Sequence, residues 1–273
     1  MKPVFSPLLP RSVSLLLPLS LSLVLSLSVS LAAEKQLPLP GETFTVAGRP
    51  AFLIAAPLCL DPAAPRPWVW YAPTLEKYPG KEEIWMISRL LAAGISIAGI
   101  DVGESYGSPA GRELFTALHT DLTRTRGYSS KPVLLGRSRG GLQLLSWAAD
   151  HPEKVGAFAG IYPVCNLTSY PGLTLAAPAY ALTPAELAAQ LTAHNPIDRL
   201  APLAAARVPL FAIHGDRDTL VPLDANSALL KSRYTALGGD MKLIIAEGQG
   251  HNLWPGFFEN PALLAFLLAH ARR

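Results

Sequence analysis

Short apolar segments alternate with segments of helical periodicity along most of the chain, and this alternation constrains the fold more than any other feature. The strand-like segments are Thr43–Val46, Ala51–Ala56, Trp68–Ala72, Ile95–Ile100, Pro132–Leu135, Val155–Ile161, Val208–Ile213 and Met241–Ala246. Helical spacing of apolar residues occurs at 84–91, 112–125, 139–149, 224–237 and 261–271. Most strand-like segments are continuously apolar, which indicates strands buried on both faces. We therefore predict one α/β domain with a mostly parallel sheet flanked by helices.

One segment, residues 166–207, interrupts this alternation. It is rich in Ala, Leu and Pro and contains no clear strand. Because the alternation resumes after it, we predict a small cap insertion over one end of the sheet. The predicted domain spans residues 34–273.

The first 33 residues have the organisation of a secretory signal peptide. Lys2 and Arg11 precede an apolar Leu/Ser/Val run, and Ala32 and Ala33 follow it. We predict cleavage between Ala32 and Glu34, which would make the protein secreted or periplasmic without stable membrane association. An uncleaved anchor is the alternative, but the run is near the short end of the roughly 17–25 residues that span a bilayer, and serines weaken it.

Charge and cysteine content exclude several classes of function. The chain has 23 Lys and Arg against 20 Asp and Glu, and no basic run interleaved with aromatic residues, so a nucleic-acid partner is not expected. Its two Cys and six His lack zinc-site spacing, and we expect no metal or organic cofactor. Cys59 and Cys165 permit either a disulfide in an oxidising compartment or two buried free thiols. The oligomeric state is open.

The most specific chemical motif is Gly136-Arg137-Ser138-Arg139-Gly140, a G-x-S-x-G pentapeptide. An apolar strand-like run precedes it, and a segment with helical spacing follows it. In such a sharp strand-to-helix turn the serine hydroxyl is lifted above the carboxyl edge of the sheet, and the glycines relieve crowding. The motif predicts Ser138 as a nucleophile, with a plain glycine-rich turn as the alternative.

A nucleophilic serine needs a base, and the base needs an orienting carboxylate. Asp216 and Asp218 follow one later strand, and His251 follows the next, so all of them should lie on the same edge as Ser138. We favour Asp218 over Asp216 because it lies further into the loop. His214 comes directly after the strand and is expected to be a structural hydrogen-bonding residue.

These motifs resemble those of the α/β-hydrolase superfamily over roughly residues 42–270. Gly136–Gly140 resembles its nucleophile elbow, and Gly250-His251 resembles its histidine loop. His214–Pro222 resembles the H-G-D-x-D-x-x-V-P acid loop of prolyl-oligopeptidase-like and dienelactone-hydrolase-like members. The resemblance implies an α/β-hydrolase fold and implies that the second aspartate of the loop, Asp218, is the catalytic acid. It carries little information about the substrate.

The predicted oxyanion loop departs from the pattern of that superfamily. Where related proteins often have His-Gly-Gly, this chain has Tyr71-Ala72-Pro73-Thr74. Proline has no N–H to donate. We therefore expect the oxyanion hole to consist of the backbone N–H groups of Arg139 and Thr74.

Several side chains near predicted strand ends are candidates for a substrate pocket. They are Tyr71, Glu104, Tyr106, Arg137 and Tyr162. Arg137 and Arg139 flank Ser138 and have two interpretations: structural ion pairs at the turn, or a contact of one of them with a substrate carboxylate or phosphate.

Together these residues predict an exported serine hydrolase that cleaves carboxylic esters through an acyl-enzyme. Ser138 attacks the carbonyl, His251 takes the serine proton, and Asp218 holds the imidazole. Export favours small-molecule or glycan esters, including acyl groups on polysaccharides. Two alternatives are a small serine peptidase of the prolyl-oligopeptidase type and a non-catalytic binding protein on the same fold.

Overall fold

The computed structural model describes residues 1, 3, 35–57 and 63–272. The chain divides into a unit of residues 1–33 and a compact unit of residues 34–273, and the following description concerns the second. The predicted signal peptide, its cleavage site and Cys59 lie outside the described residues. Both the signal peptide and the disulfide therefore stay predictions. Within the described ranges, no helix is long and apolar enough to cross a membrane.

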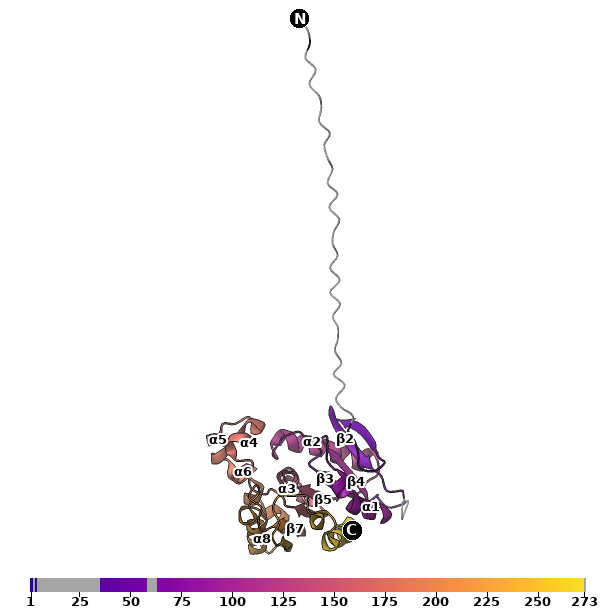
Figure 1. Ribbon diagram of the computed structural model, residues 1–273, viewed down its shortest axis with the longest axis vertical. Helices are drawn as coiled ribbons and strands as arrows, with labels where there is room; N and C mark the ends of the chain where they lie inside the picture. The colour runs from indigo at the N-terminus through magenta and orange to yellow at the C-terminus, as the bar shows by residue number, and fades with distance from the viewer. Residues whose placement is uncertain (2, 4–34, 58–62, 273) are drawn as a thin grey trace. The chain divides into compact units, whose positions relative to one another are not determined.

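An eight-stranded sheet with the order β1-β2-β4-β3-β5-β6-β7-β8 forms the centre of the domain (Figure 1). The strands are β1 (Glu42–Val46), β2 (Arg49–Ile54), β3 (Trp68–Ala72), β4 (Ser96–Ile100), β5 (Val133–Arg137), β6 (Ala157–Ile161), β7 (Leu210–Gly215) and β8 (Met241–Ala246). β2 pairs antiparallel with β1 and β4, and every other pairing is parallel. The predicted, mostly parallel sheet is confirmed.

The two predicted strands that begin at Val155 and Val208 start two residues later in the structure, at Ala157 and Leu210. Pro209 has no N–H and cannot contribute one to the sheet, so β7 begins only after it. The Val155 N–H donates to the Pro152 carbonyl and closes a turn instead.

Helices cover both faces of the sheet. The longer ones are α1 (Ile84–Ala92), α2 (Pro109–Thr120), α3 (Gly140–Asp150), α8 (Ser227–Ala236) and α10 (Pro261–Ala271). Buried residues of α2, α3 and α8 share one apolar cluster with one face of the central strands, and those of α1 and α10 share a second cluster with the other face. β3 to β7 are buried throughout, which explains their continuously apolar sequences.

The segment 166–207 contains no strand and consists mainly of short helices, and its role as a cap stays a prediction. The helices are α4 (Leu173–Ala176), α5 (Pro184–Ala189), α6 (Leu191–His194) and α7 (Ala201–Ala205), and α4, α5 and α6 group together in Figure 1. A third apolar cluster joins Leu167 and Leu187 of this insertion to Leu142 of α3 and Val221, which follows β7. The insertion therefore packs beside the start of α3, at the carboxyl edge of the sheet.

Candidate active site

Ser138 occupies a sharp turn between the end of β5 and the first residue of α3. Its φ of 52° lies in the left-handed region, which is strained for a residue with a side chain. The turn is fixed by hydrogen bonds, because the Ser138 carbonyl accepts from the N–H groups of Gly141 at 2.9 Å and Val164 at 2.8 Å. A Cβ added at Gly140 would lie only 2.0 Å from the Ala72 carbonyl oxygen, so this position requires glycine. The turn has the geometry of a nucleophile elbow.

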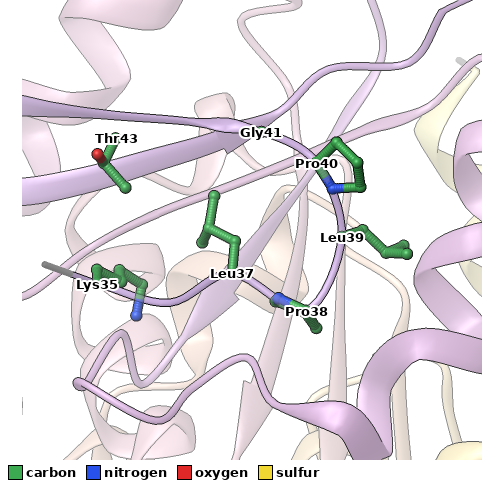
Figure 2. A pocket seen from close by; sticks show the side chains of 7 residues that line it. All are labelled: Lys35, Leu37, Pro38, Leu39, Pro40, Gly41 and Thr43. Atoms are coloured by element: carbon green, nitrogen blue, oxygen red, sulfur yellow. The ribbon is translucent and has the colours of Figure 1, made fainter.

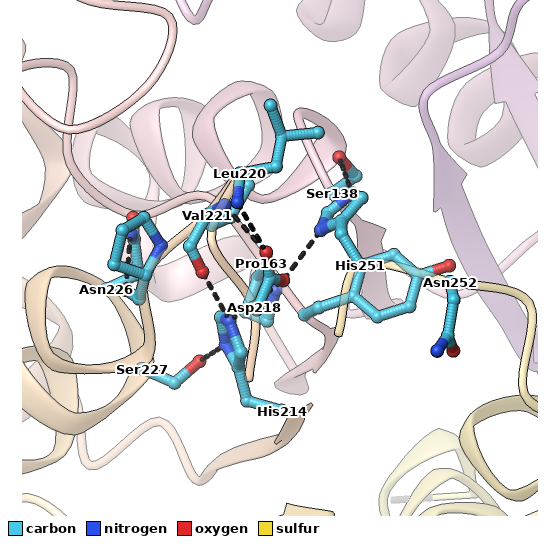
Figure 3. Close-up of polar contacts among 12 residues, drawn as sticks. Ser138, Pro163, His214, Asp218, Leu220, Val221, Asn226, Ser227, His251 and Asn252 are labelled. Carbon is cyan, nitrogen blue, oxygen red and sulfur yellow. Dashed lines mark hydrogen bonds and ion pairs between the residues drawn. The ribbon is translucent and has the colours of Figure 1, made fainter. Parts of the chain in front are cut away.

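Ser138, His251 and Asp218 form a continuous chain of hydrogen bonds (Figure 3). His251 Nε2 lies 2.9 Å from Ser138 Oγ, and His251 Nδ1 lies 2.7 Å from Asp218 Oδ2. A carboxylate can only accept from Nδ1, so the Nδ1–H donates to Asp218 and leaves Nε2 to accept the serine proton. The structure thus brings together the three residues predicted to form the triad.

Asp218 is held as an anion by its surroundings. Its side chain is buried, and burial alone would raise its pKa, but hydrogen bonds from His214, His251 and the Val221 N–H hold the pKa well below its usual range. Its Oδ1 also accepts from the Leu220 N–H at 3.0 Å. The carboxylate is therefore ionised at neutral pH and can stabilise a charged imidazole.

The neighbouring residues His214 and Asp216 have further contacts, although His214 Nε2 also lies 3.4 Å from Asp218 Oδ2. His214 is fully buried, with Nδ1 2.8 Å from Ser227 Oγ and Nε2 2.8 Å from the Val221 carbonyl, which confirms its predicted structural role. Asp216 Oδ1 accepts the Gly248 N–H at 2.7 Å and so fastens the loop that leads to His251. The catalytic base His251 therefore contacts Asp218 and not Asp216.

A buried ion pair lies directly before the serine. Arg137 Nη1 is 2.8 Å from Glu83 Oε1, and the Tyr71 hydroxyl donates to the same oxygen at 2.7 Å. Burial would lower the pKa of Arg137, but the oxygens of Tyr71, Glu83 and Tyr162 outweigh the effect of burial and raise that pKa. The pKa of Tyr71 is raised by burial and by the charge of Glu83. These contacts support the structural interpretation of Arg137, namely an ion pair beside the turn.

The Arg137 guanidinium also contacts Tyr162, whose ring packs against the imidazole of His251. Arg137 Nε donates to the Tyr162 hydroxyl at 3.1 Å, and burial raises the pKa of that hydroxyl to about 12. The Tyr162 ring lies 4.3 Å from the His251 ring and 5.0 Å from Phe257. This packing restricts the rotation of the imidazole.

A pocket of about 280 Å³ opens over the serine. It is lined by Pro73, Tyr78, Arg137, Ser138, Arg139, Tyr162, Tyr170, Leu220, His251, Asn252 and Leu253. Tyr170 comes from the insertion, so this segment contributes to the site. Leu220, Asn252 and Leu253 follow Asp218 and His251 by one or two residues, and this adjacency was the sequence signal that could have identified them.

Three predicted pocket residues do not line this pocket. Tyr71 is buried because its side chain points to the α1 face of the sheet and bonds to Glu83. Glu104 lies outside the pocket in an ion pair with Arg139. Tyr106 packs against the apolar cluster of the insertion, and its carbonyl accepts from the Tyr180 hydroxyl at 2.7 Å.

The two predicted oxyanion donors differ in position. The Arg139 N–H immediately precedes α3 and has no hydrogen-bond acceptor within the described part of the chain, so it is available to a substrate. The Thr74 side chain is buried, and its hydroxyl donates to the Tyr71 carbonyl at 3.3 Å. Thr74 is not a lining residue, and the role of its N–H stays a prediction.

A larger cavity lies elsewhere, along the segment before and into β1 (Figure 2). It measures about 380 Å³ and is lined by Lys35, Leu37, Pro38, Leu39, Pro40, Gly41 and Thr43. These residues include no nucleophile paired with a base. Among all described residues, no group of His, Cys, Asp and Glu side chains could hold a metal ion. The pocket over Ser138 is therefore the candidate active site.

Comparisons with known proteins identify the family to which this chain belongs. A sequence profile of the prolyl oligopeptidase family matches residues 116–271, which is more than half of the chain and includes Ser138, Asp218 and His251. No curated protein matches the sequence.

Solved structures show the same fold at low sequence identity. Dipeptidyl peptidase 4 of Porphyromonas gingivalis is 18% identical with a TM-score of 0.68, and the match covers 85% of this chain and 35% of that one. TT1662 of Thermus thermophilus is 19% identical with a TM-score of 0.61, over 86% and 98% of the two chains. MPT51 of Mycobacterium tuberculosis is 16% identical with a TM-score of 0.64, over 86% and 100%. This chain spans about a third of the length of the dipeptidyl peptidase.

Proposed function

The chain belongs to the prolyl oligopeptidase family and is a serine hydrolase with the α/β-hydrolase fold, and from this premise we propose that it hydrolyses carboxylic esters through an acyl-enzyme. The observation that carries the proposal is the hydrogen-bonded chain from Ser138 through His251 to Asp218 beneath an open pocket. This arrangement supplies a nucleophile, a base and an orienting carboxylate.

In the first step, the Ser138 oxygen forms a bond to the ester carbonyl carbon while its proton moves to His251 Nε2. The negative charge that develops on the carbonyl oxygen is stabilised by the Arg139 N–H and by the N-terminal end of α3. The carbon–oxygen bond to the alcohol then breaks, and the departing oxygen takes the proton from His251. The products are the alcohol and the acyl-enzyme.

In the second step, His251 takes a proton from a water molecule, and the water oxygen attacks the acyl carbon. The bond to Ser138 breaks, and the serine oxygen recovers the proton from the imidazole. Asp218 stabilises the imidazolium in both steps because it is ionised and bonded to Nδ1.

Pocket charge supports an ester over a peptide with a free amino terminus. The lining residues include no aspartate or glutamate that could bind an ammonium group, and the glutamates nearest to the site, Glu83 and Glu104, are already paired with Arg137 and Arg139. A peptidase activity is the alternative, because the family takes its name from a peptidase.

The test compares nitrophenyl esters with aminoacyl and peptidyl anilides on the purified chain. We expect ester hydrolysis, labelling by a fluorophosphonate probe, and loss of both in Ser138→Ala, with kcat reduced by roughly 10³-fold or more and an unchanged circular dichroism spectrum. Faster cleavage of anilides than of matched esters would replace the esterase with the peptidase. Equal labelling of wild type and Ser138→Ala would support a non-catalytic protein.

We also propose that the protein is exported and acts on esters outside the cytoplasm, including acyl groups on carbohydrates. The support is the order of basic, apolar and small residues in 1–33. N-terminal sequencing of the protein from a secreting host should begin at Ala33 or Glu34, whereas an intact Met1 would contradict export with cleavage. Acetylated sugars belong in the ester panel.

A further inference from the structure

Large apolar side chains are exposed on the two loops that carry Asp218 and His251. Leu220, Leu253 and Trp254 are 52%, 53% and 41% exposed, and we call these three residues the apolar rim. Leu220 lies two residues after Asp218, and the other two follow His251 within three residues. Leu220 and Leu253 line the same pocket as Ser138. Exposed apolar surface that is continuous with a reactive group indicates a contact with substrate.

The apolar rim is held in place by backbone contacts of the same two loops. The Leu220 N–H donates to Asp218 Oδ1 at 3.0 Å, and the Trp254 N–H donates to Asn252 Oδ1 at 3.0 Å. The Trp254 ring packs edge-on against Phe257 at 5.4 Å. The exposed side chains therefore stand on a fixed backbone, which lowers the entropic cost of binding an apolar group.

The reaction geometry determines which part of the substrate reaches the rim. The departing oxygen must come within hydrogen-bonding distance of His251 Nε2 to take its proton. The group attached to that oxygen then extends over the residues that flank the imidazole. Leu253 and Trp254 flank it in sequence, and Leu220 lines the pocket beside it.

We propose that the apolar rim binds an apolar alcohol portion of the ester, so that the preferred substrates have extended hydrocarbon leaving groups. This inference rests on the proposed esterase function. The occupant is part of the substrate because Leu220 and Leu253 of the rim line one pocket with Ser138. A second copy of this chain covering the rim is the competing occupant.

The experiment measures kcat/KM for ethyl, butyl and hexyl acetate. Every substrate forms the same acetyl-enzyme, and the three primary alcohols have similar acidity, so only contacts with the alcohol differ. A methylene fully removed from water contributes about fourfold. Partial burial of the four additional methylenes predicts a rise of about tenfold from ethyl to hexyl acetate, with little change in kcat where deacylation limits the rate.

Variants then assign the effect to the rim. We expect Leu253→Ser and Leu220→Ser each to reduce the hexyl-to-ethyl preference by about threefold or more. Leu237→Ser is the matched control, because Leu237 is 49% exposed at the end of α8 and should leave the preference unchanged. Trp254→Ser tests the third rim residue, which does not itself line the pocket, and should reduce the preference less than the two leucine variants.

Distinct outcomes overturn the two proposals. Equal kcat/KM across the acetates, or a preference that survives in Leu253→Ser and Leu220→Ser, would overturn the role of the rim while leaving the esterase intact. If kcat/KM is higher for methyl hexanoate than for methyl acetate but equal across the three acetates, the rim binds the acyl group and not the alcohol. A dimer that dissociates in Leu253→Ser, seen by sedimentation, would make the rim a subunit interface. Failure to hydrolyse any ester would contradict the proposed function itself.

Discussion

At the scale of single residues, two aspartates two positions apart have different partners. Asp218 bonds to His251 Nδ1, whereas Asp216 accepts the Gly248 N–H. We expect Asp218→Asn to reduce kcat by about 10⁴-fold, because the amide favours the wrong imidazole tautomer. Asp216→Asn should reduce kcat less than tenfold, since its amide oxygen can still accept from Gly248. Steady-state kinetics of both variants would show a reversed order if Asp216 were the acid.

The lowered pKa of Asp218 predicts a pH dependence of stability. Because the folded-state pKa lies below the unfolded value, the ionised carboxylate stabilises the folded protein above about pH 4. This stabilisation is lost as the pH falls from about 4 through the pKa that Asp218 has in the folded protein. The difference in unfolding free energy between wild type and Asp218→Asn, measured in urea, should therefore shrink from pH 7 to pH 3. A difference that grows on acidification would contradict the depressed pKa.

At the scale of elements, the end of β5 is tied to the turn before α1 by the pair of Arg137 and Glu83. Both side chains are buried, so Arg137→Met leaves an uncompensated carboxylate and should cost about 3–5 kcal/mol in urea unfolding. The double variant with Glu83→Gln should recover part of that loss because no buried charge remains.

The exposed pair of Arg139 and Glu104 provides the control for this prediction. Solvent screens that pair, so Arg139→Met should change the unfolding free energy by only about 0–1 kcal/mol. Equal losses in Arg137→Met and Arg139→Met would show that burial of the first pair is unimportant for stability.

The sequence predicts strands well where every residue of the strand is buried. It predicts the direction of a single side chain less well where that direction depends on a partner distant in sequence. Strands such as β4 and β6 could be predicted because burial on both faces leaves a continuous apolar run. Ser138, Asp218 and His251 could be predicted because residues that follow parallel strands share one edge. Tyr71 was misplaced because its direction depends on Glu83, a partner that the local pattern of β3 does not reveal.

At the scale of the whole molecule, the insertion shares an apolar cluster with α3 and with residues that follow β6 and β7. Leu187 is fully buried against residues such as Leu142 of α3. Leu187→Ala should therefore cost about 2–5 kcal/mol, within a single cooperative unfolding transition. Leu175→Ala in the same insertion should cost less than about 0.5 kcal/mol, because Leu175 is 65% exposed. Two separate transitions by circular dichroism and fluorescence would show that the insertion unfolds independently.

One oxygen of the Asp218 carboxylate accepts a hydrogen bond from the His251 imidazole, and the other accepts one from the Leu220 backbone N–H. Proline at position 220 or 221 would remove a backbone N–H that this carboxylate accepts and would disturb the base, whereas other residues there keep the contact. Randomising positions 253 and 254 leaves that anchor intact, which makes them the better starting points for engineering this enzyme.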